Sequence, residues 1–248
     1  MRTEIALDSI GRLIEGTHEN PFEILGPHEI NDNGRRALAV RAFLPHTAQA
    51  WLVDLAHGEV PRPMRRIHPA GLYEAICASP NGSAPRYLIR TTDETGRKLT
   101  MHDPYAFPPL LTDYDLYLLN EGRHWKLYER LGAQLRTIDG VDGVNFAVWA
   151  PNALGVSVIG DFNNWDGRRH PMRKHIPSGF WELFIPGLSE GTLYKYQVRT
   201  REGVCDKADP VGFATECPPR TASKVVDLSR FRWHDAEWLA RRRETNWL

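Results

Sequence analysis

The sequence predicts an all-β fold of two tandem β-sandwiches joined by a short helix, and three observations support this prediction. The two halves of the 248-residue chain carry similar landmarks in the same order. Short apolar segments recur at a spacing of roughly ten residues between Pro and Gly turns, which is typical of a β-sandwich. Between the halves, Leu and aromatic residues recur at helical spacing within residues 114–137.

The duplication sets the domain organisation. Matching landmarks lie 106 to 109 residues apart, and small differences of this kind indicate a duplicated domain with loop insertions rather than a solenoid of short repeats. A copy of about 100 residues is long enough to bury its own core. The matched pairs are Phe43-Leu44-Pro45 with Trp149-Ala150-Pro151, Met64 with Met172, Gly71-Leu72-Tyr73-Glu74 with Gly179-Phe180-Trp181-Glu182, Tyr87 with Tyr196, and Asp103-Pro104 with Asp209-Pro210.

The first half begins with a predicted helix inside residues 1–15. Apolar residues recur near helical spacing from Glu4 to Glu15, and Gly16 stands where a helix would stop. A turn-rich segment then continues to His28, and a first, degenerate sandwich module covers residues 16–113. Its predicted strands, each bounded by turn-forming residues, are Ala37–Phe43, Ala50–Asp54, Leu72–Ala78 and Arg86–Thr91.

The segment 114–137 is predicted to be a connecting helix. Apolar and aromatic residues past Gly122 fall at steps of three and four, which favours a helix from about Glu121 to Leu131. A flexible linker would contain fewer Leu and aromatic residues. We therefore expect this segment to pack the two modules together.

The second module, residues 138–232, has the clearest strand pattern. From Leu193 to Arg199, apolar and polar residues alternate strictly, as in a half-buried antiparallel strand. Its predicted neighbours are Val144–Ala150, Val156–Asp161 and Phe180–Ile185. Both modules are therefore predicted to be immunoglobulin-like sandwiches. Residues 233–248 are predicted to form a charged helical tail.

Composition excludes several classes of partner. Lys+Arg and Asp+Glu both number 31, so no net field attracts nucleic acid or an anionic membrane. No apolar stretch approaches the roughly 20 residues that a membrane span needs. Cys77, Cys205 and Cys217 are too few and too irregularly spaced for a disulfide framework or a zinc site, and the N-terminus lacks the apolar core of a signal peptide. A cytoplasmic location is expected.

The sequence offers no catalytic, cofactor-binding or metal-binding residue. Three Asp-Gly pairs, Asp139-Gly140, Asp142-Gly143 and Asp166-Gly167, are interpreted as turns between strands. His18 and His28 flank the loop that leads into the first module, and an ordering role is expected for them. No Gly-rich phosphate loop and no Gly-x-Ser-x-Gly elbow is present. The chain alone is not expected to be an enzyme.

A binding site is better supported, in the segment Gly160-Asp161-Phe162-Asn163-Asn164-Trp165-Asp166-Gly167. An indole beside two amides matches a sugar, which has an apolar C–H face and a rim of hydroxyls. Burying roughly 50–80 Å² at about 25 cal/mol/Å² gives about 1–2 kcal/mol, so a single aromatic plate binds weakly. The alternative is that Trp165 closes the edge of the sandwich and packs on its own module.

These residues also carry a family resemblance. The Asn-Asn-Trp loop, Gly179-Phe180-Trp181-Glu182 and Tyr194-Lys195-Tyr196 together resemble the family 48 carbohydrate-binding modules. The whole chain resembles the amino-terminal part of the bacterial 1,4-α-glucan branching enzymes. The resemblance implies a carbohydrate site at Asn163, Asn164, Trp165 and Lys195, with α-glucan or glycogen as a weakly bound partner.

Two departures from the resembled family reduce the expected affinity. Regulatory-subunit modules of family 48 carry a second Trp shortly after the Tyr-Lys strand, whereas this chain has Arg201-Glu202-Gly203-Val204-Cys205 there. In the first copy the Trp loop is replaced by Asp54-Leu55-Ala56-His57-Gly58-Glu59. A role in docking against a catalytic domain gains weight accordingly.

The leading functional hypothesis is therefore the non-catalytic amino-terminal part of a glycogen branching enzyme. The family's catalytic barrel carries the paired carboxylates of glycosyl transfer, and no barrel motif is present up to Asn246-Trp247-Leu248, so we expect such a barrel to follow. The parent reaction would transfer α-1,4-glucan segments to form α-1,6 branches. Two alternatives stay open: a stand-alone α-glucan-binding or regulatory module, and a purely structural interaction domain.

Overall fold

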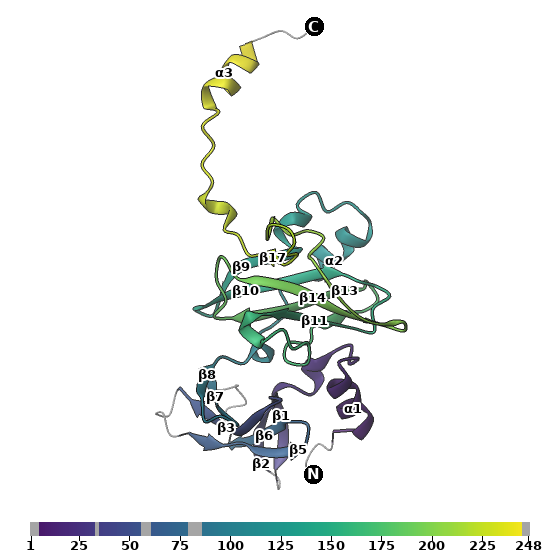
Figure 1. Cartoon of the computed structure of the whole chain (residues 1–248), viewed down its shortest axis with the longest axis vertical. Helices are drawn as coiled ribbons and strands as arrows, with labels where there is room; N and C mark the ends of the chain where they lie inside the picture. The colour runs from purple at the N-terminus through teal and green to yellow at the C-terminus, as the bar shows by residue number, and fades with distance from the viewer. Residues whose placement is uncertain (1–4, 33–34, 56–60, 79–85, 245–248) are drawn as a thin grey trace.

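The structure is a computed structural model that describes residues 5–32, 35–55, 61–78 and 86–244. Two sheet modules stack end to end, and the C-terminal segment projects from the second (Figure 1). Helix α1 (Leu7–Glu15) precedes the first module and ends at Gly16, whose φ of 71° is left-handed. This confirms the predicted helix and its stop, although Glu4 lies outside the described residues.

The first module consists of two antiparallel four-stranded sheets, in the orders β1-β2-β6-β5 and β4-β3-β7-β8. A cluster of buried side chains that includes Val40, Leu52 and Ile89 lies between them. The four predicted strands correspond to β2, β3, β6 and β7, and the other four were not predicted. The bounds are β1 Gly26–Asp32, β2 Arg35–Phe43, β3 Thr47–Asp54, β4 Arg62–Pro63, β5 Arg65–His68, β6 Leu72–Ala78, β7 Tyr87–Asp93 and β8 Lys98–Met101.

The second module repeats the two-sheet plan. One antiparallel sheet has the order β12-β13-β10-β9, and the other has the order β11-β14-β17-β16 with β15 paired to β14. The all-β prediction of two tandem sandwiches is confirmed. The bounds are β9 Gly132–Ile138, β10 Val141–Trp149, β11 Gly155–Gly160, β12 Arg173–His175, β13 Phe180–Pro186, β14 Leu193–Thr200, β15 Gly203–Lys207, β16 Ala214–Thr215 and β17 Ser223–Lys224.

The two modules are packed on each other through a continuous apolar core. Leu13, Ile24 and Tyr105 lie in the same buried cluster as Phe146 and Trp181 of the second module. Because the cluster joins residues from α1, the first module and the second, we expect the modules to behave as one mechanical unit. Short 3₁₀ turns lie at Pro21–Glu23, Pro104–Ala106, Leu127–Glu129, Asp161–Asn163 and Leu228–Arg230.

The connecting helix occurs, but its predicted position was wrong, and so was the expectation that it packs the two modules together. Leu116 and Leu119 pack on Ala147 and Phe180 of the second module. Helix α2 spans Asp113–Asn120, before the predicted Glu121–Leu131. It starts at a capping box in which the Thr112 hydroxyl accepts from the Asp115 N–H, and it is closed at Gly122, whose φ is 66°. The predicted range holds a 3₁₀ turn and then leads into β9, which begins at Gly132 inside the segment assigned to the connector.

A buried carboxylate attaches the segment just before α2 to the second module. Glu182 on β13 is 1% exposed, and its Oε1 accepts from the N–H groups of Leu110 and Leu111 at 2.8 and 2.9 Å. Asn145 donates to the same oxygen at 3.1 Å, and His175 Nε2 lies 2.8 Å from Oε2. Removing this side chain would leave several buried donors without a partner, so Glu182 holds the chain before α2 against the sheet.

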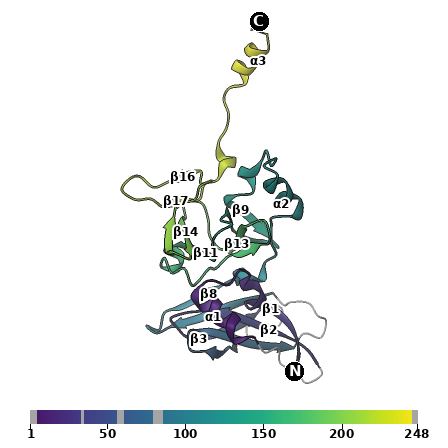
Figure 2. The same cartoon turned by 90° about the vertical axis from the view of Figure 1, so that its right-hand side faces the viewer.

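The C-terminal tail stands apart from both modules (Figures 1 and 2). Helix α3 covers Ala236–Glu244, within the predicted helical tail, and none of its residues is buried. Residues 245–248 lie outside the described residues. Among the helices of the described residues, none is long and apolar enough to cross a membrane.

Candidate functional site

The Asn-Asn-Trp loop follows β11 and is held by one buried side chain. Asn163 is 1% exposed. Its Oδ1 accepts from the Gly160 N–H at 3.0 Å, and its Nδ2 donates to the Val158 carbonyl at 2.8 Å and lies 2.8 Å from His170 Nδ1. This amide is committed to the protein, so it shapes the loop instead of facing a ligand. The expectation that Asn163 touches sugar is corrected to a positioning role.

The two residues that follow present themselves at the surface. Asn164 and Trp165 both have a φ of 57°, a left-handed conformation that is rare for a bulky residue. Asn164 is exposed and Trp165 is half-buried. The Trp165 N–H donates to the Gly160 carbonyl at 2.9 Å, and its indole Nε1 donates to Asp161 Oδ1 at 2.8 Å. The local hydrogen bonds therefore fix the orientation of the indole.

Lys195 lies on the outward face of β14, as the alternation predicted. Tyr194 and Tyr196 are buried, whereas Lys195 is half-buried and stands opposite Ile159 of β11. Gln197, two residues further, is on the same face as Lys195. A Cβ placed on Gly167 would come within 2.0 Å of Gln197 Oε1, so the end of the loop rests directly on that side chain. The loop and Lys195 thus share one face of the sheet.

The far side of the loop is tied to the first module. The Asp166 carboxylate accepts from Arg168 Nε and Nη2 at 2.9 and 2.8 Å, and Arg168 Nη2 also lies 2.8 Å from His46 Nε2. Arg169 Nη2 donates to the Pro45 carbonyl at 3.1 Å. The candidate sugar loop is therefore also part of the contact between the modules, which no sequence pattern indicated.

The other sequence candidates have structural roles. Asp139-Gly140 forms the predicted turn, with φ of 51° and 78° between β9 and β10. Asp142-Gly143 is not a turn, because both residues belong to β10. A Cβ on Gly143 would lie 2.6 Å from the Phe184 ring, so close packing explains this glycine. Near the first module, His18 Nδ1 accepts from the Asn20 N–H at 3.2 Å, in line with a loop-ordering role.

The hairpin between β14 and β15 is the place where a second aromatic residue for sugar stacking was looked for. This hairpin carries Val204, 58% exposed, and no aromatic residue from Arg201 to Cys205. In the first copy, the replacement segment Asp54–Glu59 lies mostly outside the described residues. Within the described part of the chain, no group of three or more His, Cys, Asp or Glu could hold a metal ion.

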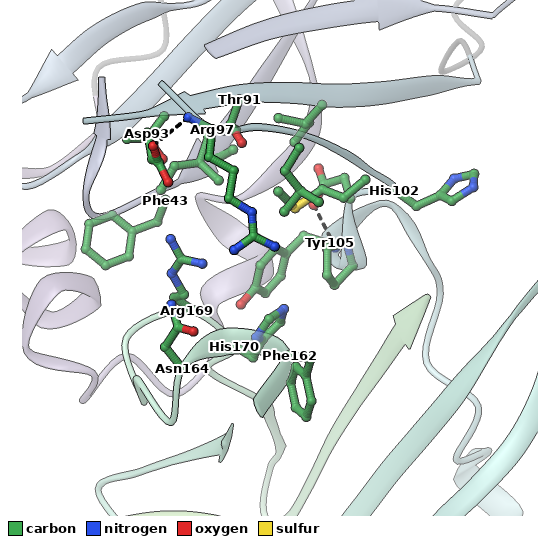
Figure 3. A pocket seen from close by; sticks show the side chains of 18 of the residues that line it. Phe43, Thr91, Asp93, Arg97, His102, Tyr105, Phe162, Asn164, Arg169 and His170 are labelled. Atoms are coloured by element: carbon green, nitrogen blue, oxygen red, sulfur yellow. Dashed lines mark hydrogen bonds between the residues drawn. The ribbon is translucent and has the colours of Figure 1, made fainter. Parts of the chain in front are cut away.

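A cavity of about 300 Å³ lies between the modules, and sequence reasoning missed it (Figure 3). Burial lowers the pKa of His170, at its edge, to about 3, and Arg169 acts in the same direction. The ring is therefore neutral, with Nδ1 free to accept from Asn163. Burial raises the pKa of Asp103, on the opposite wall, to about 6 against the opposing effect of its hydrogen bond from Tyr87.

The fold and the Trp-bearing loop define a carbohydrate-binding module, and the family comparison agrees. Residues 130–212 match the family described as "Carbohydrate-binding module 48 (Isoamylase N-terminal domain)". Residues 6–105 match "alpha-1,4-glucan branching enzyme GlgB, N-terminal domain". The chain therefore corresponds to the amino-terminal region of GlgB, with the GlgB N-terminal domain before the carbohydrate-binding module along it.

Relatives extend this similarity over nearly all of the chain. It is 46% identical over 245 residues to the 1,4-alpha-glucan branching enzyme GlgB of Rhodopirellula baltica, and this match covers 98% of this chain and 33% of the relative. It is 47% identical over 244 residues to the GlgB of Thermosynechococcus vestitus, with 98% and 31% covered. The chain spans about a third of the length of these relatives.

Among solved structures, the chain overlaps a Bacillus subtilis type I pullulanase complexed with maltose. The TM-score is 0.35 at 16% identity, with 84% of this chain and 28% of the pullulanase covered. Structural similarity at this level carries no information about function.

Proposed function

We propose that this chain is the non-catalytic amino-terminal part of a 1,4-α-glucan branching enzyme, which contacts α-glucan through the Trp165 loop and supports the catalytic barrel. The observation that carries the proposal is the oriented indole of Trp165, held by Asp161 and Gly160 in a module that matches carbohydrate-binding family 48. The parent reaction would transfer α-1,4-glucan segments to form α-1,6 branches in glycogen. The balanced charge and the low cysteine content agree with a cytoplasmic location.

The proposed contacts use three side chains. The face of Trp165 supplies about 1–2 kcal/mol by covering the C–H face of one sugar ring. Asn164 is exposed on the loop, and Lys195 lies on the same sheet face as the end of the loop; both supply hydrogen bonds to hydroxyl groups. With one aromatic plate the affinity is low, so glycogen, which presents many chains, is the ligand that would be retained.

The test is a native gel that contains glycogen. Trp165→Ala is expected to migrate faster than the unmodified chain in that gel, with little change in thermal midpoint. Trp238→Ala is the matched control, because Trp238 lies on α3, away from both modules, and is 52% exposed. Equal retention of Trp165→Ala and the control would remove Trp165 from the site.

A second role, docking to the barrel, is favoured by exposed aromatic residues on the connector. This segment lies at the end of the second module from which the tail leaves (Figures 1 and 2). Several exposed aromatic side chains on one segment often mark a surface that another protein domain covers. The exposed fractions are 68% for Tyr114, 58% for Tyr117, 91% for Trp125 and 46% for Tyr128.

This docking role is tested by titrating the chain with the separately produced catalytic part of the Rhodopirellula baltica relative. Trp125→Ser is expected to weaken that association about tenfold, whereas Trp165→Ala leaves it unchanged. If Trp125→Ser binds the catalytic part as tightly as the unmodified chain does, the connector is not the docking surface.

A further inference from the structure

Hydrogen bonds between buried groups fix the walls of the cavity between the modules. Tyr105 of the first module donates from its hydroxyl to the Pro171 carbonyl of the second at 3.1 Å. Behind it, the Tyr87 hydroxyl donates to Asp103 Oδ2 at 2.6 Å, and the Tyr105 N–H donates to Asp103 Oδ1 at 2.9 Å. The walls are therefore held by buried hydrogen bonds, one of which crosses between the modules.

Two guanidinium groups from opposite modules point into this space. Arg97, on the turn between β7 and β8, reaches between Tyr105 and Arg169 (Figure 3). Its side chain is exposed and makes no hydrogen bond or ion pair with the described part of the chain. Arg169 uses one nitrogen for the Pro45 carbonyl, and Asn164 lies beside it on the loop. The cavity thus presents unused donors from both modules.

The remaining lining indicates the class of ligand. Phe43 and Tyr105 offer apolar ring surface, and Thr91 offers a hydroxyl. Asp93, Asp103 and Asp161 are also among the lining residues, so the two arginines do not give the cavity a net excess of positive charge. A cavity with aromatic ring surface, unused hydrogen-bond donors and little net charge suits a ligand with many hydroxyl groups better than an anion.

We propose that this cavity binds the end of an α-glucan chain, as a second subsite beside the Trp165 face. The inference rests on the proposed function, because it assigns a further contact for the same ligand. Asp161 joins the two sites, since it is one of the lining residues of the cavity and its carboxylate accepts from the Trp165 indole at 2.8 Å. Two weak sites that lie side by side can bind the same polymer at once. They then retain it much more strongly than either site would alone.

The test variant is Arg97→Ala, and its matched control is Lys98→Ala. Both residues are exposed and adjacent, Arg97 on the turn and Lys98 at the start of β8, but only Arg97 lines the cavity. Because the exposed Arg97 side chain makes no hydrogen bond or ion pair with the described residues, its loss is expected to leave the thermal midpoint unchanged. Losing hydrogen bonds from a charged donor should weaken maltoheptaose binding about tenfold in Arg97→Ala, with no change in Lys98→Ala.

The outcomes separate this inference from the proposed function. Failure of the unmodified chain to bind either maltoheptaose or glycogen would sink both. Binding that is reduced by Trp165→Ala but is equal in Arg97→Ala, Lys98→Ala and the unmodified chain would overturn only the cavity subsite. Thermal protection by inorganic phosphate, lost in Arg97→Ala, without protection by maltoheptaose would overturn the glucan assignment in favour of an anion.

Discussion

Replacing Asn163 by Ala is expected to destabilise the chain strongly, although the residue lies in a loop. The substitution removes the partner of the Gly160 N–H, the Val158 carbonyl and His170 Nδ1, at 3.0, 2.8 and 2.8 Å. Asn163 is 1% exposed, so water does not readily replace the lost amide.

The magnitude follows from these contacts. A buried polar group left without a partner costs about 1–3 kcal/mol, and partial relaxation brings the sum for three groups to about 3 kcal/mol of unfolding free energy. For a chain of this size, about 1 kcal/mol lowers the thermal midpoint by roughly 2–4 °C, so a decrease of about 6–12 °C is expected.

Urea unfolding followed by Trp fluorescence measures this loss directly. The matched control is Asn164→Gly, which removes the neighbouring amide from an exposed position with a φ of 57° that glycine accepts readily. The control is expected to stay within about 0.5 kcal/mol of the unmodified chain. A loss below about 1 kcal/mol in Asn163→Ala, or equal losses in both variants, would refute the positioning role.

Three further predictions concern protonation, packing and activity. His170, with a folded pKa of about 3, should show no imidazole titration by NMR between pH 8 and 5. Its unfolded pKa is about 6.5, so its contribution to stability is complete above that pH and falls by about 2 kcal/mol by pH 5; a titration midpoint above 6 would contradict this. Gly155→Ala should lose about 2 kcal/mol in urea unfolding, because its Cβ would lie 1.9 Å from the Gly16 carbonyl oxygen, whereas Gly11→Ala, with open space around it, should gain about 0.5–1 kcal/mol. Equal effects of these two glycine substitutions would argue against the close contact. The purified chain should leave amylose–iodine absorbance constant over time, and an enzymatic change would mean that an active site was overlooked.

Strand prediction succeeded both for a strand with one buried face, β14, and for strands buried on both faces, such as β11 and β13. The alternation from Leu193 to Arg199 predicted β14 because Tyr194 and Tyr196 enter the core while Lys195 faces outward. Short strands such as β4 and β16, of two residues each, carry no periodic signal, so only their pairing partners define them.

The connector shows why helical spacing alone misled. The spacing past Gly122 spans a 3₁₀ turn that has no buried residue and the start of β9, which is itself a strand of the sheet. A local signal for the true helix was present in Thr112 and Asp115, three residues apart, and in Gly122 as its stop. End signals were more informative here than apolar periodicity.

By itself, the sequence determined the duplication, the all-β class and the loop that carries Trp165, because repeated landmarks, strand alternation and turn residues are local properties. Tertiary structure decided the rest of the site. Asn163 and Asn164 are chemically identical neighbours, yet one is buried and committed to His170 while the other is exposed. The cavity needs Arg97 and Arg169 to meet from different modules, and only the packing of the two modules brings them together.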